Sequence, residues 1–264
     1  EVIDATADAC SPTEDCTVLE IGPGIGTLTR SLAARYKRVI ALEVDRSLIP
    51  VLRYTLEDCP NVTVVNEDVM QTDLPALLAE AFAAGSVAVC ANLPYYITTP
   101  ILMKLLESRL PFSGITVMVQ AEVADRLCAG AGEKAYGAIT AVLNYYARAE
   151  EILFVPADRF VPAPKVNSKV IRITLWQEKP CVPRDEALLF RTVKAAFGQR
   201  RKTLANALAT GYPELGKERV SKILADMGLA ADIRGERLSI ADFTALSDRI
   251  GEALSQTEGG NGHD

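Results

Sequence analysis

The sequence predicts an α/β fold, in which a Rossmann-like parallel sheet is flanked by helices and followed by a small all-helical C-terminal domain. Short β-branched runs alternate with helical patterns through the first two-thirds of the chain. A glycine-rich turn follows the first of these runs, and beyond residue 184 only helical periodicity remains. The predicted domains are residues 1–176 and 185–254, with a linker at 177–184 and a disordered tail at 255–264.

The strands of the sheet are predicted from runs of β-branched and apolar residues. Parallel strands are expected at 17–21, 38–43, 62–66, 87–91 and 115–119, with helices between them. Two later strands, at 151–155 and 169–175, have a proline-rich loop and no helix between them. This connection predicts an antiparallel hairpin that closes one edge of the sheet.

The helices are predicted from periodicity and from their first residues. A helix at 27–35 follows the glycine-rich turn, and another at 98–107 has Thr98 or Thr99 as its N-cap and Pro100 in its first turn. The helical domain is expected to contain helices at 185–197, 202–210, 217–227 and 240–254.

Composition excludes several classes of protein. The chain has 264 residues and is 49% hydrophobic, so it can bury a sizeable core. It has no apolar stretch of membrane-spanning length and no signal-peptide pattern, and we expect a cytoplasmic monomer. The six cysteines are scattered singly and the one histidine, His263, lies in the polar tail, so no metal site is expected. The chain opens without a methionine in the second half of a predicted helix, and we expect that native sequence precedes it.

Charge is distributed unevenly. The net charge is −6 at pH 7, but residues 159–202 contain eleven Lys or Arg and three acidic residues, a net charge of +8 that leaves −14 for the rest. Such asymmetry is typical of a basic face that binds nucleic acid phosphates. An ordinary solvated surface is the alternative interpretation.

The glycine-rich turn predicts a nucleotide cofactor. The first strand runs into Glu20-Ile21-Gly22-Pro23-Gly24-Ile25-Gly26, where glycines allow a tight bend and close approach of a ligand to the backbone. The spacing does not fit the dinucleotide pattern, because Thr27 stands where a third glycine is needed, so NAD is disfavoured.

Acidic residues follow the next two strands. Glu43 ends the second strand and is predicted to accept hydrogen bonds from ribose hydroxyls, and Asp68 follows the third strand within reach of an adenine edge. Each acid alone fits a helix cap or a solvated loop equally well. The full set of predicted cofactor-binding residues is Glu20, Gly22, Gly24, Gly26, Glu43, Val44, Asp68, Val69 and Asn92.

The segment Asn92-Leu93-Pro94-Tyr95 after the fourth strand suits methylation of an exocyclic amino group of adenine. That nitrogen is a poor nucleophile because its lone pair is delocalised into the ring. The Asn92 side-chain oxygen can accept one of its hydrogens, and the Leu93 carbonyl, exposed by the turn that Pro94 fixes, can accept the other. The lone pair can then point at a sulfonium methyl group, and no general base is required.

Two aromatic residues are predicted to hold the target base. Tyr95 would stack on the ring and stabilise its developing positive charge, and Phe160 is a candidate for the other face. The alternative is that both aromatic residues belong to the core. The predicted catalytic residues are therefore Asn92, Leu93, Pro94, Tyr95 and Phe160.

From Val18 to about Ile250 the sequence resembles the small-subunit rRNA adenine dimethyltransferase family. The resemblance lies in LEIGPG at 19–24, ANLPYYITTP at 91–100, PAPKV at 162–166 and FGQRRKTL at 197–204. It implies that S-adenosyl-L-methionine (SAM) supplies two methyl groups to N6 of each of two adjacent adenosines near the 3′ end of the small-subunit rRNA during ribosome assembly. The first domain would then bind SAM and carry out catalysis.

The resemblance also implies a rRNA-docking role for the helical domain, with Lys165, Arg200, Arg201 and Lys202 as RNA-binding residues. The partner would be the small ribosomal subunit. Members of the family carry a Gln-Asn-Phe-Leu segment before the first helix that this sequence lacks. A protein without that segment is expected to bind SAM more weakly than one that has it.

Three alternatives remain open. A related class methylates adenine in large-subunit rRNA and gives antibiotic resistance, but the 162–166 and 199–202 segments fit it less well. A DNA methyltransferase more often has two prolines in the tetrapeptide. The protein could also be chiefly an assembly checkpoint that binds immature small subunits, with catalysis incidental.

Overall fold

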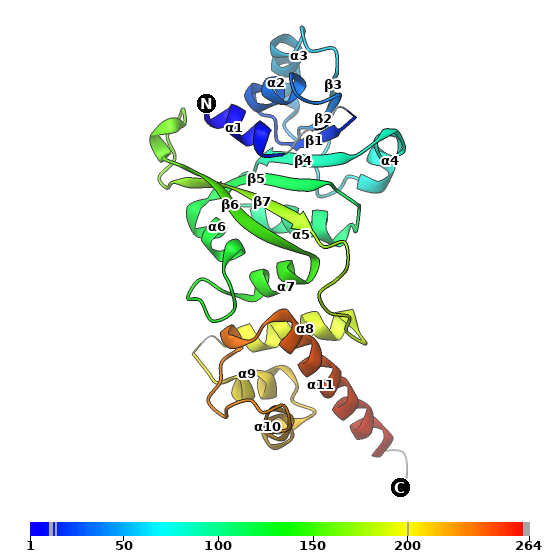
Figure 1. Ribbon diagram of the computed structural model, residues 1–264, viewed down its shortest axis with the longest axis vertical. Helices are drawn as coiled ribbons and strands as arrows, with labels where there is room; N and C mark the ends of the chain where they lie inside the picture. Colours follow the sequence, from blue (N-terminus) through cyan, green and yellow to red (C-terminus); the bar gives the residue numbers. More distant parts are fainter. Residues whose placement is uncertain (11–12, 14, 200, 261–264) are drawn as a thin grey trace. The chain divides into compact units, whose positions relative to one another are not determined.

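The structure, a computed structural model, describes residues 1–10, 13, 15–199 and 201–260. The chain forms two compact units (Figure 1). The first comprises Glu1–Cys128 and Ala147–Leu175, and the second comprises Ala129–Tyr146 and the described part of Trp176–Asp264.

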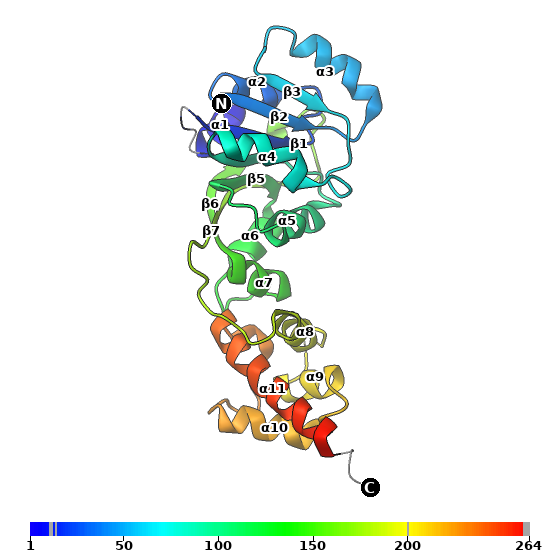
Figure 2. The same cartoon turned by 90° about the vertical axis from the view of Figure 1, so that its right-hand side faces the viewer.

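The first unit is built on a seven-stranded sheet of order β3-β2-β1-β4-β5-β7-β6. Its strands are β1 (Thr17–Ile21), β2 (Arg38–Leu42), β3 (Val62–Val65), β4 (Val87–Asn92), β5 (Gly114–Gln120), β6 (Ala147–Val155) and β7 (Ser168–Leu175). The first five run parallel, whereas β7 pairs antiparallel with both β5 and β6. The predicted parallel sheet and its antiparallel edge hairpin are therefore confirmed, and Figure 2 shows the strands from a second direction.

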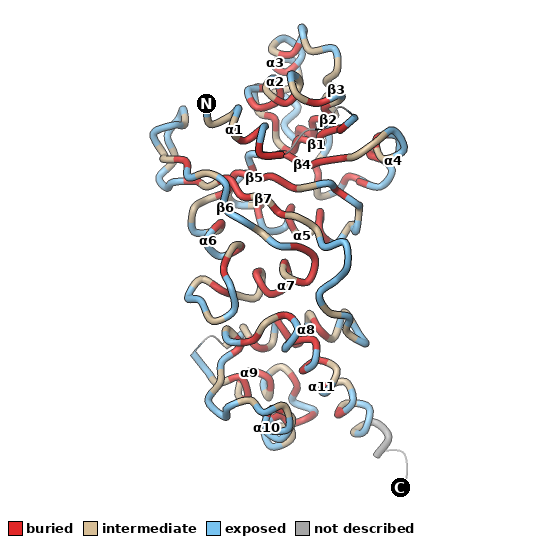
Figure 3. Tube along the Cα trace, viewed as in Figure 1, coloured by how far each residue is buried: buried red, intermediate tan, exposed pale blue. Residues whose placement is uncertain are grey.

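The central strands are buried on both faces. All five residues of β1 and the first five of β4 are buried, which explains why apolar residues do not alternate with exposed polar ones along these runs. On one face Val18, Ala88 and Cys90 pack against Ala7 of α1 and Leu32 of α2. Figure 3 shows these strands among the buried segments of the first unit.

Helices connect the strands of this unit. They are α1 (Val2–Ala9), α2 (Thr27–Ala33), α3 (Ile49–Thr55), α4 (Leu74–Ala84), α5 (Thr98–Glu107) and α6 (Ala121–Cys128), with short 3-10 turns η1 (Arg46–Leu48) and η2 (Ala157–Arg159). The predicted helix at 98–107 is present, but its N-cap is Ile97, and the Thr98 hydroxyl instead donates to the Pro94 carbonyl oxygen at 3.0 Å.

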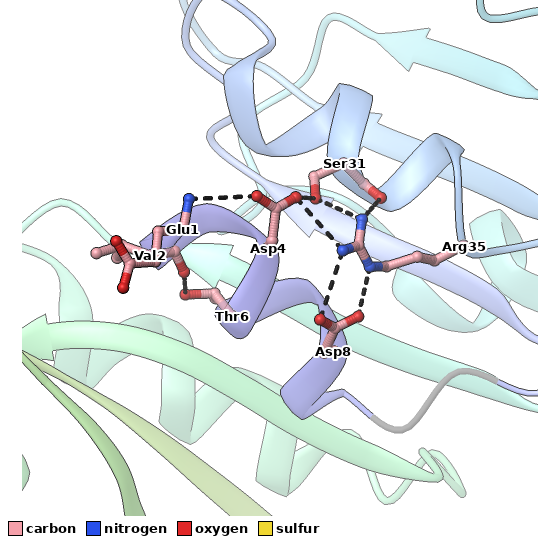
Figure 4. Close-up of polar contacts among 7 residues, drawn as sticks. All are labelled: Glu1, Val2, Asp4, Thr6, Asp8, Ser31 and Arg35. Carbon is pink, nitrogen blue, oxygen red and sulfur yellow. Dashed lines mark hydrogen bonds and ion pairs between the residues drawn. The ribbon is translucent and has the colours of Figure 1, made fainter.

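A polar cluster joins α1 to the end of α2 (Figure 4). Arg35 Nε donates to Asp8 Oδ1 at 2.6 Å, and Arg35 Nη2 reaches Asp4 Oδ1 at 3.3 Å. Ser31 Oγ donates to the same Asp4 oxygen at 2.9 Å. The glycine-rich turn leads directly into α2. By linking α2 to α1, this cluster therefore also holds the helix that follows the turn.

The second unit is helical and contains α7 (Ala138–Tyr146), α8 (Glu186–Phe197), α9 (Leu204–Gly211), α10 (Gly216–Asp226), η3 (Gly235–Arg237) and α11 (Ile240–Gly260). The Tyr136, Phe197 and Phe243 rings pack in sequence with centroids 5.9 Å apart. The Tyr136 hydroxyl donates to the Leu238 carbonyl oxygen at 3.0 Å. The segment 129–146, which we placed in the domain 1–176, thus packs with the C-terminal helices.

The C-terminal helix extends beyond its predicted end at residue 254. It continues to Gly260, so the first part of the predicted disordered tail is helical. The reason is tertiary: Arg219 of α10 donates to Gln256 Oε1 and to Thr257 Oγ1, both at 2.8 Å. Residues 261–264, including His263, lie outside the described residues. No helix in the described part of the chain is long and apolar enough to cross a membrane.

Candidate functional site

The predicted cofactor-binding residues and the segment 92–95 lie at the carboxyl ends of the parallel strands. From β1 the chain continues outward to β2 and β3, whereas β4, the other neighbour of β1, leads to β5 on the opposite side. The boundary between β1 and β4 is therefore the topological switch point, where open α/β sheets bind ligands. The glycine-rich turn leaves β1 there, and Asn92 ends β4.

The glycine-rich turn has the backbone that only glycine adopts easily. Gly22, Gly24 and Gly26 have φ angles of +70°, +60° and +90°. A Cβ atom added at Gly22 or Gly24 would meet no atom within 4 Å, whereas one at Gly26 would approach Thr55 Oγ1 to 3.0 Å. Gly22 and Gly24 thus border open space that a ligand can enter, and Gly26 begins α2 in close packing.

Glu43 is buried and holds the turn in place. One carboxylate oxygen accepts a hydrogen bond from the Gly24 amide at 3.2 Å, and the other accepts one from the Asp45 amide at 2.8 Å. Asn66 Nδ2 donates to the Glu43 carbonyl oxygen at 2.7 Å, which links the ends of β2 and β3. These contacts fix the carboxylate beside the turn, and its predicted contact with ribose hydroxyls stays a prediction.

Glu20 is the most unusual acid of the site. Its side chain is 1% exposed, and its Oε2 atom has no hydrogen-bond partner among the described residues. Burial raises the pKa of Glu20 to about 7, and the nearby Glu43 carboxylate acts in the same direction. The Thr29 hydroxyl lowers this pKa, but its effect is smaller than that of burial. An unpartnered buried oxygen beside the glycine-rich turn fits a ligand that brings a donor.

The remaining cofactor candidates differ in exposure. Val44 is 63% exposed and offers an apolar surface at the end of β2, whereas Val69 is 7% exposed and its side chain belongs to the core. Asp68 is half-buried and accepts a hydrogen bond from the Met70 amide at 2.8 Å. The Val69 side chain is therefore less accessible to a ligand than that of Asp68 or Val44.

The Asn-Leu-Pro-Tyr segment leaves two hydrogen-bond acceptors available. Asn92 is exposed at the end of β4, and the Leu93 amide donates to the Met118 carbonyl oxygen at 3.1 Å. Pro94 begins a turn that the Ile97 amide closes on its carbonyl oxygen at 3.2 Å. Within the described part of the chain, no group donates to the Asn92 side-chain oxygen or the Leu93 carbonyl. The two oxygens on which the predicted chemistry depends are thus unoccupied.

Tyr95 and Phe160 are both anchored to the edge hairpin. The Tyr95 hydroxyl lies 2.9 Å from Ser168 Oγ, at the start of β7. Phe160 is half-buried and packs against the cluster of Met118, Val155 and Val170, and Met118 is the register partner of Asn92. Neither aromatic residue is fully buried, so each keeps some surface that a base could contact.

The predicted RNA-binding residues divide between the two units. Lys165 is exposed in the loop between β6 and β7 of the first unit. Arg201 and Lys202 are exposed just before α9 in the second unit, where the Thr203 hydroxyl caps the helix by accepting from the Asn206 amide at 3.4 Å. Arg200 lies outside the described residues.

Part of the positive charge in residues 159–202 is neutralised internally. Lys169 pairs with Asp125 and Glu151, at 2.6 and 2.7 Å. Three further cations pair within the helical unit: Lys179 with Glu186, Arg184 with Glu252, and Arg191 with Glu214. The basic segment is therefore less of a free cationic face than its net charge suggests.

Sequence reasoning missed Ser168 and Lys104. The Ser168 contact with Tyr95 spans 73 residues. Lys104 reaches the backbone of the loop that follows β3, at 2.8 and 2.9 Å. No local pattern identifies either residue, because each acts through a segment distant in the chain.

Comparison with known proteins finds a matching family and similar named proteins. A family model described as ribosomal RNA adenine dimethylase matches residues 1–250. A Bacillus licheniformis protein named ribosomal RNA small subunit methyltransferase A is 48% identical over 257 residues, covering 96% of this chain and 88% of that protein. A protein of the same name from Geobacillus kaustophilus is 46% identical and covers 92% and 84% of the two chains.

Two solved structures resemble the chain over almost its whole length. A dimethyladenosine transferase from Plasmodium falciparum has a TM-score of 0.78 at 22% identity, with 96% of each chain covered, and shows likeness of fold. The 23S rRNA methyltransferase ErmE has a TM-score of 0.71 at 26% identity and covers 95% of this chain and 97% of that one.

Proposed function

The chain belongs to the ribosomal RNA adenine dimethylase family, and we propose that it dimethylates N6 of two adjacent adenosines near the 3′ end of the small-subunit rRNA, with SAM as methyl donor. The observation that carries this proposal is a pair of acceptors at the end of β4, the Asn92 side-chain oxygen and the Leu93 carbonyl, to which no described residue donates. The small ribosomal subunit would be its partner, and the cytoplasm, where ribosomes work, its location.

The residues around the glycine-rich turn fit SAM. The open space at Gly22 and Gly24 admits the methionine part of the cofactor, and the unpartnered Glu20 oxygen can accept a hydrogen bond from its ammonium group. Glu43 would hold the ribose, and Asp68 with Val44 the adenine. When bound, SAM supplies an electrophilic methyl group.

The chain's own residues prepare the acceptor nitrogen. Asn92 and the Leu93 carbonyl each accept one N6 hydrogen, which draws the nitrogen towards tetrahedral geometry and frees its lone pair for attack. Tyr95 and Phe160 hold the two faces of the base. The methylated nitrogen then loses a proton to water, so no buried base is needed. The second methyl group comes from a second SAM molecule after SAH has left, and the single remaining N6 hydrogen can then bond to only one of the two acceptors.

The large-subunit alternative has weaker support. Relatives at 44–48% identity are named for the small subunit, whereas ErmE is 26% identical. We propose that the helical domain, with Lys165 of the first unit and Arg200, Arg201 and Lys202, docks on rRNA.

The decisive experiment offers labelled SAM to small subunits that lack the adenosine methyl groups, to large subunits and to DNA, each separately. The proposal expects label on two adjacent adenosines of the small-subunit rRNA. Label found mainly in large subunits or DNA would overturn it. Stable binding of small subunits with no transfer of label would favour the checkpoint role.

A further inference from the structure

Lys104 connects two parts of the proposed site that are distant in sequence. It lies on α5, the helix that follows the Asn-Leu-Pro-Tyr segment, and is half-buried. Its ammonium group donates to the carbonyl oxygens of Met70 and Thr72, at 2.9 and 2.8 Å. Both carbonyls belong to the segment 68–72, which follows β3 and contains Asp68.

The segment 68–72 uses its other polar groups internally. The Gln71 and Thr72 amides donate to the Asp68 carbonyl oxygen at 2.8 and 2.9 Å, and the Met70 amide donates to the Asp68 carboxylate. These bonds shape the turn, and the buried Val69 side chain packs it into the core. The two hydrogen bonds from Lys104 add a directional link to α5, and hydrogen bonds from a charged donor are stronger than neutral ones.

The same helix also holds the proposed catalytic segment. Near its start, the Thr98 hydroxyl donates to the Pro94 carbonyl oxygen at 3.0 Å. Ile101, Leu102 and Leu105 of the helix are buried, so α5 is firmly packed. The packed helix α5 thus contacts the turn at Pro94 at its start and, through Lys104, the segment 68–72 further along.

We propose that Lys104 is a positioning residue for methyl transfer, which fixes the Asp68 turn, and with it the adenine end of the cofactor site, relative to Asn92. This inference rests on the proposed function, because it assumes that Asp68 faces the cofactor. Lys104 does not touch the reacting atoms in this role. Its effect on the reaction passes through the backbone of Met70 and Thr72.

The surroundings of Lys104 suit a substitution that removes only the two hydrogen bonds. The side chain borders a surface hollow of about 500 Å³, lined also by Met70, Thr72, Pro100, Met103 and Glu107. In Lys104→Met the aliphatic stem is kept, and water in the hollow can hydrate the two freed carbonyls. Lys104→Arg keeps two donors, and Glu107→Gln on the same wall is the matched control.

The test titrates S-adenosylhomocysteine (SAH), the product form of the cofactor, against the four proteins by calorimetry and follows backbone hydrogen exchange. We expect Lys104→Met to raise the Kd for SAH about tenfold and to speed exchange of the amides at 69–72. With small subunits as substrate, KM for SAM should rise by a similar factor, while kcat at saturating SAM changes less than about threefold. Lys104→Arg should restore most of the affinity, and Glu107→Gln should match the wild type.

Each outcome separates this inference from the proposed function. Equal Kd values and equal exchange at 69–72 in wild type and Lys104→Met would overturn the role of Lys104 and leave the enzyme assignment intact. If the wild type itself does not bind SAH, the assumed cofactor fails and the inference fails with it. If Lys104→Met does not fold, Lys104→Gln, which keeps a shorter donor, takes its place under the same criteria.

Discussion

The hydroxyl of Tyr95 lies 2.9 Å from the hydroxyl of Ser168, and Ser168 is completely buried. This contact ties the last residue of the Asn-Leu-Pro-Tyr segment to the first residue of β7. Stacking on a base requires that the plane of the Tyr95 ring be fixed. Ser168 of the edge hairpin fixes it, rather than a residue of the loop that contains Tyr95.

Ser168→Ala is therefore expected to slow methyl transfer without unfolding the protein. One neutral hydrogen bond contributes about 1 kcal/mol, so if its whole effect falls on the transition state, kcat decreases roughly fivefold. Tyr95→Phe keeps the ring and should have the same effect. Single-turnover rates for both variants and for the double variant form a cycle, and the double variant should be no slower than either single one. Additive losses would mean that the two hydroxyls act separately.

Asn92→Ala should remove one of the two acceptors for the N6 hydrogens. By analogy with other transition-state hydrogen bonds, the loss is about 10²–10³-fold in kcat. Binding of small subunits, measured by co-sedimentation, should be unchanged because docking is proposed to lie elsewhere. A variant that still methylates at more than a tenth of the normal rate would contradict the proposed role of Asn92.

Gly24→Ala should weaken SAH binding at least about tenfold, because the new methyl group enters the open space beside the turn and the φ angle of +60° strains any other residue. The strain should also cost about 1 kcal/mol of folding free energy. Gly114→Ala is the matched control, since its Cβ would also meet nothing within 4 Å but no positive φ is present. Calorimetric titration and urea unfolding separate the two effects, and equal Kd values for both variants would refute this use of Gly24.

Glu20 should make the free energy of unfolding depend on pH. Its pKa is about 7 in the folded chain, above its ordinary value of 4.5, so between these values the folded state holds a proton that the unfolded state has released. Stability from this group is therefore present at low pH and lost as pH rises from about 4.5 to 7, by up to about 3 kcal/mol. Glu20→Gln should remove this loss. In urea unfolding, the gain in stability of the variant over the wild type should therefore be larger at pH 8 than at pH 5. A difference that does not vary with pH would contradict the raised pKa.

Local patterns predicted the sheet and the strand ends at which the candidate site residues lie. The β-branched runs identified each of the seven strands, but β6 begins at Ala147, directly after α7 and four residues before its predicted start. Gly22 and Glu43 each follow a strand directly, and Asn92 ends β4. Their convergence then follows from the topology of a parallel sheet. The strands and the segments at their ends could thus be predicted because local sequence patterns identify them.

Other features depend on contacts between distant segments. Thr98 has the residue type of an N-cap, but α5 already includes it, and its hydroxyl donates to the Pro94 carbonyl oxygen instead of accepting from a backbone amide. The last turns of α11 have the composition of a tail, and Arg219 on another helix keeps them ordered. Nothing in the local sequence around Ser168 or Lys104 predicts its partner.

The membership of α7 in the helical unit has a practical consequence for dividing the protein. Its residues Leu143 and Tyr145 are buried, and Tyr145 packs edge-on against Phe190 of α8 with ring centroids 5.5 Å apart. A fragment ending at Leu175 would keep α7 but lack the C-terminal helices that cover it, so the apolar side chains of α7 would be exposed to water. We expect such a fragment to aggregate, and one in which residues 129–146 are replaced by a short glycine–serine bridge to stay dispersed in light-scattering measurements.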